Sequence, residues 1–317
     1  MKSSTTNSAK LVQMTVTATM RNVYFSIVLL GLGVALVEGH GLFEERQIMQ
    51  RQIADADGFI AALDQSGGST PKALDLYGYP ADKYQVGEPS MFDAVHDMRR
   101  RIITSPSFHG DRIIGAILFE DTMKRQVNGR PVSEYLWQEK RIVPFLKVDK
   151  GLENEENGVQ LMKPIPQLED LLLESDKYGI FGTKMRSLIK TDNAYGIKAI
   201  VDQQFEIGKR ILAAGLVPII EPEVDIYSPA KTQAEELLKV ELLKHLDTLQ
   251  DDQFVILKLS IPDIPSFYKE CAEHPRCLRV LALSGGYSRE EASSLLCQQP
   301  EMIASFSRAL TEGLSYS

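Results

Sequence analysis

The sequence predicts a single (β/α)8 barrel of the α/β class, and three observations carry that prediction. Short aliphatic runs recur eight times within residues 44–317, which is the pattern of buried parallel strands. Amphipathic stretches that suit helices lie between several of these runs. No repeat or Pro/Ser-rich linker divides this region, so we expect one domain. A doubly wound open sheet is the alternative fold, because counting strands cannot show closure.

The eight runs share a second property: each ends in polar or Gly/Pro-containing sequence, where a buried strand leaves its sheet. We expect the strands to lie within residues 58–65, 112–119, 142–149, 181–188, 216–224, 254–261, 278–284 and 302–310.

Two predicted helices stand out between the strands. In residues 232–249, Ala234 and several leucines recur at helical spacing, and charged residues lie outside that stripe. In residues 288–299, Ser288 is a predicted N-cap, and acidic residues follow in the first turn.

The sequence ends nine residues after Arg308. We therefore expect the eighth helix of the barrel to be missing from this chain.

Residues 1–43 differ in composition from the barrel region. They hold three basic residues and one acid, begin with a Ser/Thr-rich stretch, and contain a 15-residue apolar run at 23–37. A membrane span needs about 20 residues, so this run suits the apolar part of a targeting signal better. We expect a targeting-like or disordered extension. A membrane anchor and an untranslated stretch are the alternatives.

The overall charge and the cysteine content exclude several function classes. The chain has 43 acidic and 35 basic residues and a net charge of −8, which argues against nucleic acid as a partner. Its three cysteines, Cys271, Cys277 and Cys297, show no CxxC spacing, which excludes a disulfide scaffold and makes a zinc site improbable. The five histidines are scattered, so we expect no metal site.

Charged residues interrupt the predicted strands near their carboxyl ends, where the active sites of barrels assemble. Strand side chains alternate between two faces, so Lys258 shares a face with Phe254 and Ile256. The same alternation brings charged residues of five strands to corresponding heights: Asp64, Lys147, Asp149, Lys184, Arg186, Glu221, Glu223 and Lys258.

A structural ion network inside the barrel is one interpretation of this pattern, because buried charges are costly unless they pair. The repetition of the pattern on five strands favours a catalytic centre instead. A lysine amine that is held among other cations in a partly dry pocket has a depressed pKa and attacks carbonyl groups. Lys258 fits this role beside Lys184 and Arg186. Glu221 and Asp64 supply carboxylates for proton transfer during imine formation and carbon–carbon bond cleavage.

The loops after the seventh and eighth predicted strands carry residues that suit a phosphate. They have the sequences SGGYS (284–288) and SFSRAL (305–310). Ser284, the amides of Gly285 and Gly286, and the guanidinium of Arg308 form a plausible anion cradle at the position where barrels often bind phosphate.

Together these stretches resemble the class I, or Schiff-base, fructose-bisphosphate aldolases, and most closely their compact bacterial-type branch. The resemblance covers about residues 44–312. It rests on ALDQSGGSTPKAL (62–74), PFLKVDKGL (144–152), GVQLMKPI (158–165), FGTKMRS (181–187), GLVPIIEPEV (215–224), LKLSIP (257–262), LSGGYSREEA (283–292) and IASFSRAL (303–310).

The resemblance implies a role for each charged residue. Lys258 matches the lysine that forms the Schiff base, and Glu221 matches the glutamate that moves protons during carbinolamine dehydration. Glu223 matches a neighbour that supports the lysine cluster. Asp64 matches the base that takes the hydroxyl proton on carbon 4, and Lys184 matches the lysine that orients this hydroxyl.

The resemblance also implies two phosphate sites. Lys147 resembles a phosphate-binding lysine, and Ser69 and Ser66 resemble serines near the distal phosphate. Animal members have an arginine near this phosphate, where the present chain has Ala73 beside Lys72. Arg186 matches a substrate-binding arginine near Lys184. The site for the phosphate on carbon 1 is matched by Ser284, Gly286 and Arg308.

The function implied is reversible cleavage of fructose 1,6-bisphosphate to dihydroxyacetone phosphate and glyceraldehyde 3-phosphate in glycolysis and gluconeogenesis. No metal or other cofactor is expected. The expected partners are sugar phosphates and further copies of the chain, without nucleic acid or a membrane contact of the barrel. A cytoplasmic location is expected from the family, with plastid-like targeting by residues 1–43 as the alternative. Two other functions remain open: another Schiff-base sugar-phosphate aldolase or transaldolase, and a truncated inactive barrel that acts as a binding scaffold.

Overall fold

The structure is a computed structural model that describes residues 44–65 and 68–316. The chain forms two compact units, residues 1–50 and 51–317. Residues 44–50, the described part of the first unit, are helical. The predicted targeting segment in residues 1–43 lies outside the described residues. None of the helices that the structure describes is long and apolar enough to cross a membrane.

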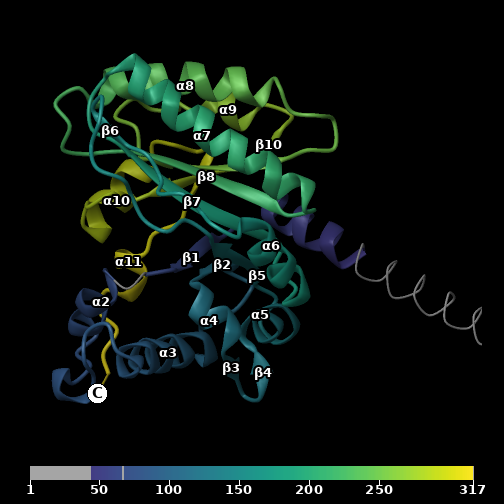
Figure 1. The fold of residues 1–317 in the computed structure, drawn as a ribbon, viewed down its shortest axis with the longest axis vertical. Coiled ribbons are helices and arrows are strands. Elements are labelled where there is room, and N and C mark those ends of the chain that lie inside the picture. The colour runs from purple at the N-terminus through teal and green to yellow at the C-terminus, as the bar shows by residue number, and fades with distance from the viewer. Residues whose placement is uncertain (1–43, 66–67, 317) are drawn as a thin grey trace, which may run out of the picture. The chain divides into compact units, whose positions relative to one another are not determined.

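The second unit is built on eight parallel strands that follow one another in chain order around the sheet (Figure 1). The first and last of these strands also contact each other, so the sheet nearly closes and the predicted barrel is confirmed. The strands are β1 (Phe59–Leu63), β2 (Ile113–Leu118), β5 (Val143–Lys147), β7 (Gly182–Ile189), β8 (Val217–Val224), β9 (Val255–Ser260), β10 (Cys277–Leu283) and β11 (Met302–Ala304). A short antiparallel strand, β6 (Val159–Gln160), pairs with β7.

Helices alternate with the strands, as the sequence predicts. The longer ones are α3 (Pro89–Thr104), α6 (Leu168–Lys177), α7 (Ala194–Ala213), α8 (Lys231–Leu246) and α10 (Arg289–Leu296). The shorter ones are α2 (Thr70–Leu76), α4 (Glu120–Lys124), α5 (Val132–Glu134), α9 (Lys269–Ala272) and α11 (Arg308–Thr311). Residues 51–55 are also helical. The structure further describes a 3-10 turn (Ala81–Lys83), a π turn (Tyr135–Glu139) and a small hairpin of β3 (Gln126–Val127) and β4 (Arg130–Pro131).

Both helices that the sequence singles out are present. In α8, Leu238, Leu242 and Leu246 are fully buried in the core, which is the predicted apolar stripe. At the start of α10, the Ser288 hydroxyl accepts the amide of Glu291 at 3.2 Å, and the Glu291 carboxylate accepts the amide of Ser288 at 3.0 Å. This reciprocal cap satisfies two amides that would otherwise lack partners at the helix terminus.

The eighth strand is shorter than predicted. The prediction placed residues 302–310 in one strand, but β11 ends at Ala304, and Arg308 begins the four-residue helix α11. The ladder between β10 and β11 ends at Ala282 and Ala304, so the following residues have no strand partner. Arg, Ala and Leu are strong helix formers, which explains the turn into helix. The absence of a full eighth helix stays a prediction.

One face of each strand packs against the helices outside the barrel, and the other face points to the barrel interior. Ile220 of β8 and Leu257 of β9 belong to a core cluster shared with α7 and α8, and α7 contacts both β7 and β8 (Figure 1). Leu63 of β1 packs in a second cluster with Met98 of α3. Because strand side chains alternate, the residues adjacent to these outward positions point into the barrel.

Candidate active site

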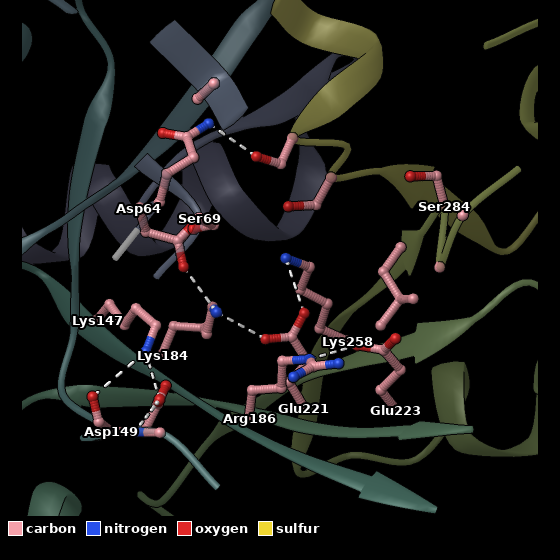
Figure 2. A pocket seen from close by; sticks show the side chains of 18 of the residues that line it. Asp64, Ser69, Lys147, Asp149, Lys184, Arg186, Glu221, Glu223, Lys258 and Ser284 are labelled. Carbon is pink, nitrogen blue, oxygen red and sulfur yellow. Dashed lines mark hydrogen bonds and ion pairs between the residues drawn. The ribbon is translucent and has the colours of Figure 1, made fainter. Parts of the chain in front are cut away.

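A cavity of about 470 Å³ opens at the carboxyl ends of the barrel strands (Figure 2). It brings together every predicted site residue whose side chain the structure describes: Asp64, Ser69, Lys147, Lys184, Arg186, Glu221, Glu223, Lys258, Ser284, Gly285 and Gly286. Ser66 and the side chain of Arg308 lie outside the described residues.

Four charged side chains form a continuous chain across the floor of this cavity (Figure 2). Lys184 Nζ lies 2.7 Å from Asp64 Oδ2 and 2.8 Å from Glu221 Oε2. Lys258 Nζ lies 2.9 Å from Glu221 Oε1. All four residues are buried, so charge pairing offsets the loss of hydration that each of them suffers.

Strand register explains why residues so distant in sequence meet at one level. The β7–β8 ladder pairs Arg186 with Glu221. The β8–β9 ladder pairs Ile220 with Leu257, the residues that immediately precede Glu221 and Lys258. Alternation then turns both Glu221 and Lys258 to the inside of the barrel.

Side chains behind the strands hold β8 in place where its ladder with β9 has ended. The buried amide of Gln204, on α7, accepts the Glu221 amide N–H at 2.8 Å and donates to Ser187 Oγ at 3.0 Å. Ser260 Oγ donates to the Val224 carbonyl at 2.6 Å and accepts the Val224 amide at 3.0 Å. These bonds fix the strand segment that presents Glu221 to the two lysines.

Two further ion pairs lie at the wall of the cavity (Figure 2). Arg186 Nε pairs with Glu223 Oε2, and Lys147 Nζ pairs with Asp149 Oδ1. The Asp149 carboxylate also accepts the Gly151 amide at 3.2 Å. Glu223 was expected to support the lysine cluster, and the structure places it on Arg186.

The charges at the cavity floor determine the protonation of three groups. Burial would raise the pKa of Asp64, but the positive charges of Lys184 and Lys258 hold it well below its usual value. The pKa of Glu221 is lowered by the same two lysines against the same effect of burial. Burial would lower the pKa of Lys184, but the carboxylates of Asp64 and Glu221 raise it far above its usual value. Lys184 is therefore a permanent ammonium group and a poor nucleophile at neutral pH.

The pKa of Lys147, at the cavity wall, is shifted in the opposite direction to that of Lys184. Burial, assisted by the charge of Lys184, lowers the pKa of Lys147 despite the attraction of Asp149. The cavity thus combines cations at its wall with a bridged set of charges at its floor. This arrangement suits a multiply charged anionic substrate.

The loop after β10 forms a tight turn that only glycines allow. The amides of Gly286 and Tyr287 donate to the Ser284 carbonyl at 2.6 and 2.9 Å. Gly285 and Gly286 have φ values of +58° and +140°, and a Cβ on Gly285 would lie 2.7 Å from Ile226 Cγ2. The turn brings Ser284 to the cavity, as the predicted phosphate cradle requires.

Several residues that line the cavity were absent from the predicted site: Gln65, Lys72, Ser305, Ser307 and Thr311. Asp149, which also lines the cavity, was among the charged residues that strand alternation brought to this end of the barrel, although no role was predicted for it. Gln65 and Ser307 lie in two of the sequence stretches, 62–74 and 303–310, in which neighbouring site residues were predicted. The two residues form a hydrogen bond of 2.8 Å although they come from opposite ends of the barrel sequence. Within the described residues, no three His, Cys, Asp or Glu side chains are grouped to hold a metal ion.

Comparison with known proteins adds a family to this geometry. The family model for class I fructose-bisphosphate aldolase matches residues 46–254. The class 1 fructose-bisphosphate aldolase of Synechocystis sp. is 60% identical over 272 residues, which are 86% of this chain and 90% of that protein. The enzyme of the same name from Porphyromonas gingivalis is 59% identical over 265 residues, 84% and 89% of the two chains.

A solved structure supports the fold. The fructose-bisphosphate aldolase of Plasmodium falciparum superposes with a TM-score of 0.66 at 24% identity, covering 86% of each chain. At this identity the likeness concerns the barrel alone.

Proposed function

The chain belongs to the class I fructose-bisphosphate aldolases, lyases that cleave fructose 1,6-bisphosphate in glycolysis, and from this premise we infer the role of each residue in its cavity. One observation carries the assignment. The amine of Lys258 lies at the cavity floor, 2.9 Å from a carboxylate that also contacts a second lysine. A nucleophilic amine with an adjacent proton acceptor is what Schiff-base formation requires.

We propose that Lys258 gives one proton to the adjacent Glu221 carboxylate and that its amine then attacks the ketone carbon of the substrate; a second proton moves from the nitrogen to the former ketone oxygen, which gives a carbinolamine. Glu221 donates the proton it took to the departing hydroxyl, so water is lost and a protonated imine forms. The protonated imine nitrogen is then the electron sink for bond cleavage. Lys184 remains charged throughout and keeps Glu221 ionised between turnovers.

Asp64 is the proposed base for cleavage. Its carboxylate takes the proton of the hydroxyl on carbon 4, the bond between carbons 3 and 4 breaks, and its electron pair moves into the imine to give an enamine. The aldehyde product leaves, the enamine takes a proton from solvent at carbon 3 while Asp64 releases its own proton to solvent, and hydrolysis of the imine frees Lys258. The Lys184 ammonium, 2.7 Å from Asp64, orients both the carboxylate and the hydroxyl.

The phosphates are proposed to bind at two ends of the cavity. Ser284 and the amide of Gly285 take the phosphate on carbon 1, while the amide of Gly286 donates to the Ser284 carbonyl within the turn. Lys147 and Ser69 take the distal phosphate, and Arg186 contributes positive charge between them. A volume of about 470 Å³ is suited to a ligand of this size. Ser66 and Arg308, whose side chains the structure does not describe, stay predicted phosphate ligands.

Borohydride trapping tests the assignment. Reduction in the presence of fructose 1,6-bisphosphate converts an imine to a stable secondary amine, which peptide mass spectrometry locates. We expect the label on Lys258, and we expect Lys258→Met to lose both the label and the cleavage activity. Lys150→Met, an exposed lysine that pairs with Glu120, is the matched control and keeps both. A label on another lysine would contradict the assignment.

The same experiment separates the alternative functions. A different Schiff-base aldolase or transaldolase would be labelled at Lys258 with other sugar phosphates in preference to fructose 1,6-bisphosphate. A binding scaffold would bind the sugar phosphate without any label. Product analysis by coupled assay for dihydroxyacetone phosphate distinguishes these cases from the proposed reaction.

We further propose that sugar phosphates, and not nucleic acids, are the ligands of this chain, as its net charge of −8 supports. The homo-oligomer stays a prediction, which light scattering of the purified chain checks. Cytoplasmic location, with targeting by residues 1–43 as the alternative, also stays a prediction. Mass spectrometry of the mature amino terminus decides between them.

A further inference from the structure

A fully buried arginine stands behind the active site. Arg99, in the second half of α3, has no exposed surface. Its NH1 group donates to Thr122 Oγ1 at 2.6 Å, and its NH2 group donates to the Gln65 carbonyl at 2.7 Å and to Gln65 Oε1 at 3.2 Å. Burial lowers the pKa of Arg99 to about 10 although Asp64 and Asp121 attract its charge, so it is still protonated at neutral pH.

This charge has no direct counter-ion among the residues that the structure describes: the partners of Arg99 are neutral oxygens. A buried guanidinium without an adjacent carboxylate lowers stability compared with an apolar side chain of similar volume. Core packing therefore does not account for an arginine here. Two of its three hydrogen bonds converge on Gln65, the residue that directly follows the proposed base Asp64.

Arg99 also sets the orientation of the Gln65 amide. A guanidinium only donates hydrogen bonds, so it draws the amide oxygen toward itself. The amide nitrogen then points the other way and donates to Ser307 Oγ at 2.8 Å. Ser307 lies between β11 and α11 and lines the cavity, as Gln65 does.

The bond from Gln65 to Ser307 crosses the seam of the barrel. In the part of the chain that the structure describes, β1 and β11 contact each other but share no ladder pairing. The seam therefore lacks the hydrogen bonds that fix the spacing between neighbouring strands elsewhere. Arg99 and Gln65 supply a side-chain connection at its carboxyl end, between the loop that follows Asp64 and the loop that precedes α11.

We propose that Arg99 and Gln65 are positioning residues for the cleavage step: they hold the end of β1 so that the Asp64 carboxylate meets Lys184, and they keep the Ser307 loop beside it. The inference rests on the proposed role of Asp64 as the base. It predicts that loss of the connection slows carbon–carbon cleavage while imine formation at Lys258 continues, because Asp64 acts only after the imine has formed.

The test compares two readouts in the same variants. One is kcat for cleavage of fructose 1,6-bisphosphate. The other is borohydride labelling of Lys258 by dihydroxyacetone phosphate, which needs the imine but no bond cleavage. In Arg99→Met and Gln65→Met we expect kcat to fall by at least about tenfold and labelling to stay within about threefold of the unsubstituted chain. The double variant should be no slower than the slower single variant, because both substitutions break one connection.

Arg100→Met is the matched control, since Arg100 lies on the same helix with its side chain exposed and paired to Asp97. It should keep both readouts. Thermal unfolding of every variant accompanies the kinetics, so that losses are expressed per folded molecule. If Arg99→Met does not fold, the test uses Gln65→Met and Arg99→Lys instead. Arg99→Lys keeps the positive charge but loses the forked contact of the guanidinium.

Folded Gln65→Met with the kcat of the unsubstituted chain would overturn the proposal. So would labelling and cleavage that decline in equal proportion, or single effects that multiply in the double variant. If the unsubstituted chain itself is not labelled at Lys258, the proposed function is wrong, and the positioning role of Arg99 and Gln65 is wrong with it. Slow cleavage with normal labelling supports both.

Discussion

Replacing Lys184 by Met leaves two buried carboxylates without the ammonium group that now lies between them. Lys184 Nζ is 2.7 Å from Asp64 and 2.8 Å from Glu221, and its side chain is 4% exposed. Glu221 keeps Lys258 as a partner at 2.9 Å, so Asp64 is the group that loses its contact cation. Removing one member of a buried ion pair lowers the free energy of unfolding by about 3–5 kcal/mol.

The loss should depend on pH. In the unsubstituted chain the pKa values of Asp64 and Glu221 are depressed, so their contribution to stability is full above their unfolded values and is lost only as the pH falls below them. Without Lys184, burial dominates and raises the folded-state pKa of Asp64. The variant then loses stability as the pH rises through that value. The difference between the two chains is therefore larger at about pH 8 than at about pH 5.

Urea unfolding of both chains at these two pH values measures the effect. Lys184→Arg, which keeps the charge, should recover part of the loss. Lys190→Met removes an exposed pair with Glu155 on the same part of the chain and should change the unfolding midpoint little at either pH. A loss for Lys184→Met no greater than for Lys190→Met, or one that does not vary with pH, would refute the account of the buried charges.

Three other substitutions probe separate features. Glu221→Gln should lower kcat by about 10²–10⁴-fold with a much smaller change in KM, because the carboxylate transfers protons while the phosphates bind; steady-state kinetics would contradict this by showing the reverse. Gly285→Ala should raise KM at least about tenfold, because the φ of +58° and a Cβ 2.7 Å from Ile226 would force the turn out of the position in which it binds phosphate. An unchanged KM would show that this turn does not bind the phosphate. Burial raises the pKa of Glu235 from 4.5 to about 7, so its contribution to stability is full below pH 4.5 and is lost as the pH rises toward 7. Glu235 pairs with the buried Lys231 at 2.8 Å, so the absolute effect of Glu235→Gln includes the loss of that pair. The stability of the unsubstituted chain relative to Glu235→Gln should nevertheless fall between about pH 4.5 and pH 8, and a difference in urea that does not change with pH would contradict the raised value.

The fold and the floor of the cavity follow from local pattern. Buried parallel strands are aliphatic on both faces, so a lysine or glutamate inside one is conspicuous, and the period of two assigns it to a face. Lys184, Glu221 and Lys258 were predicted in this way, and the structure joins them in one chain of contacts. The cap at Ser288 was equally predictable, because the hydrogen bonds of a helix cap span only three residues.

Contacts between distant segments are what the pattern could not predict. The end of β11 at Ala304 depends on where the ladder with β10 stops, which is a property of the closing sheet. In the sequence, Arg99 is one of several cations in an amphipathic helix, and Gln204 is a polar residue in another amphipathic helix. In the structure, both side chains are fully buried against strand ends. Hydrophobic periodicity reports which face of an element is buried, because burial acts on each side chain separately. A hydrogen bond needs a particular partner at about 3 Å, and only the folded chain brings residues 65, 99 and 307 within that distance.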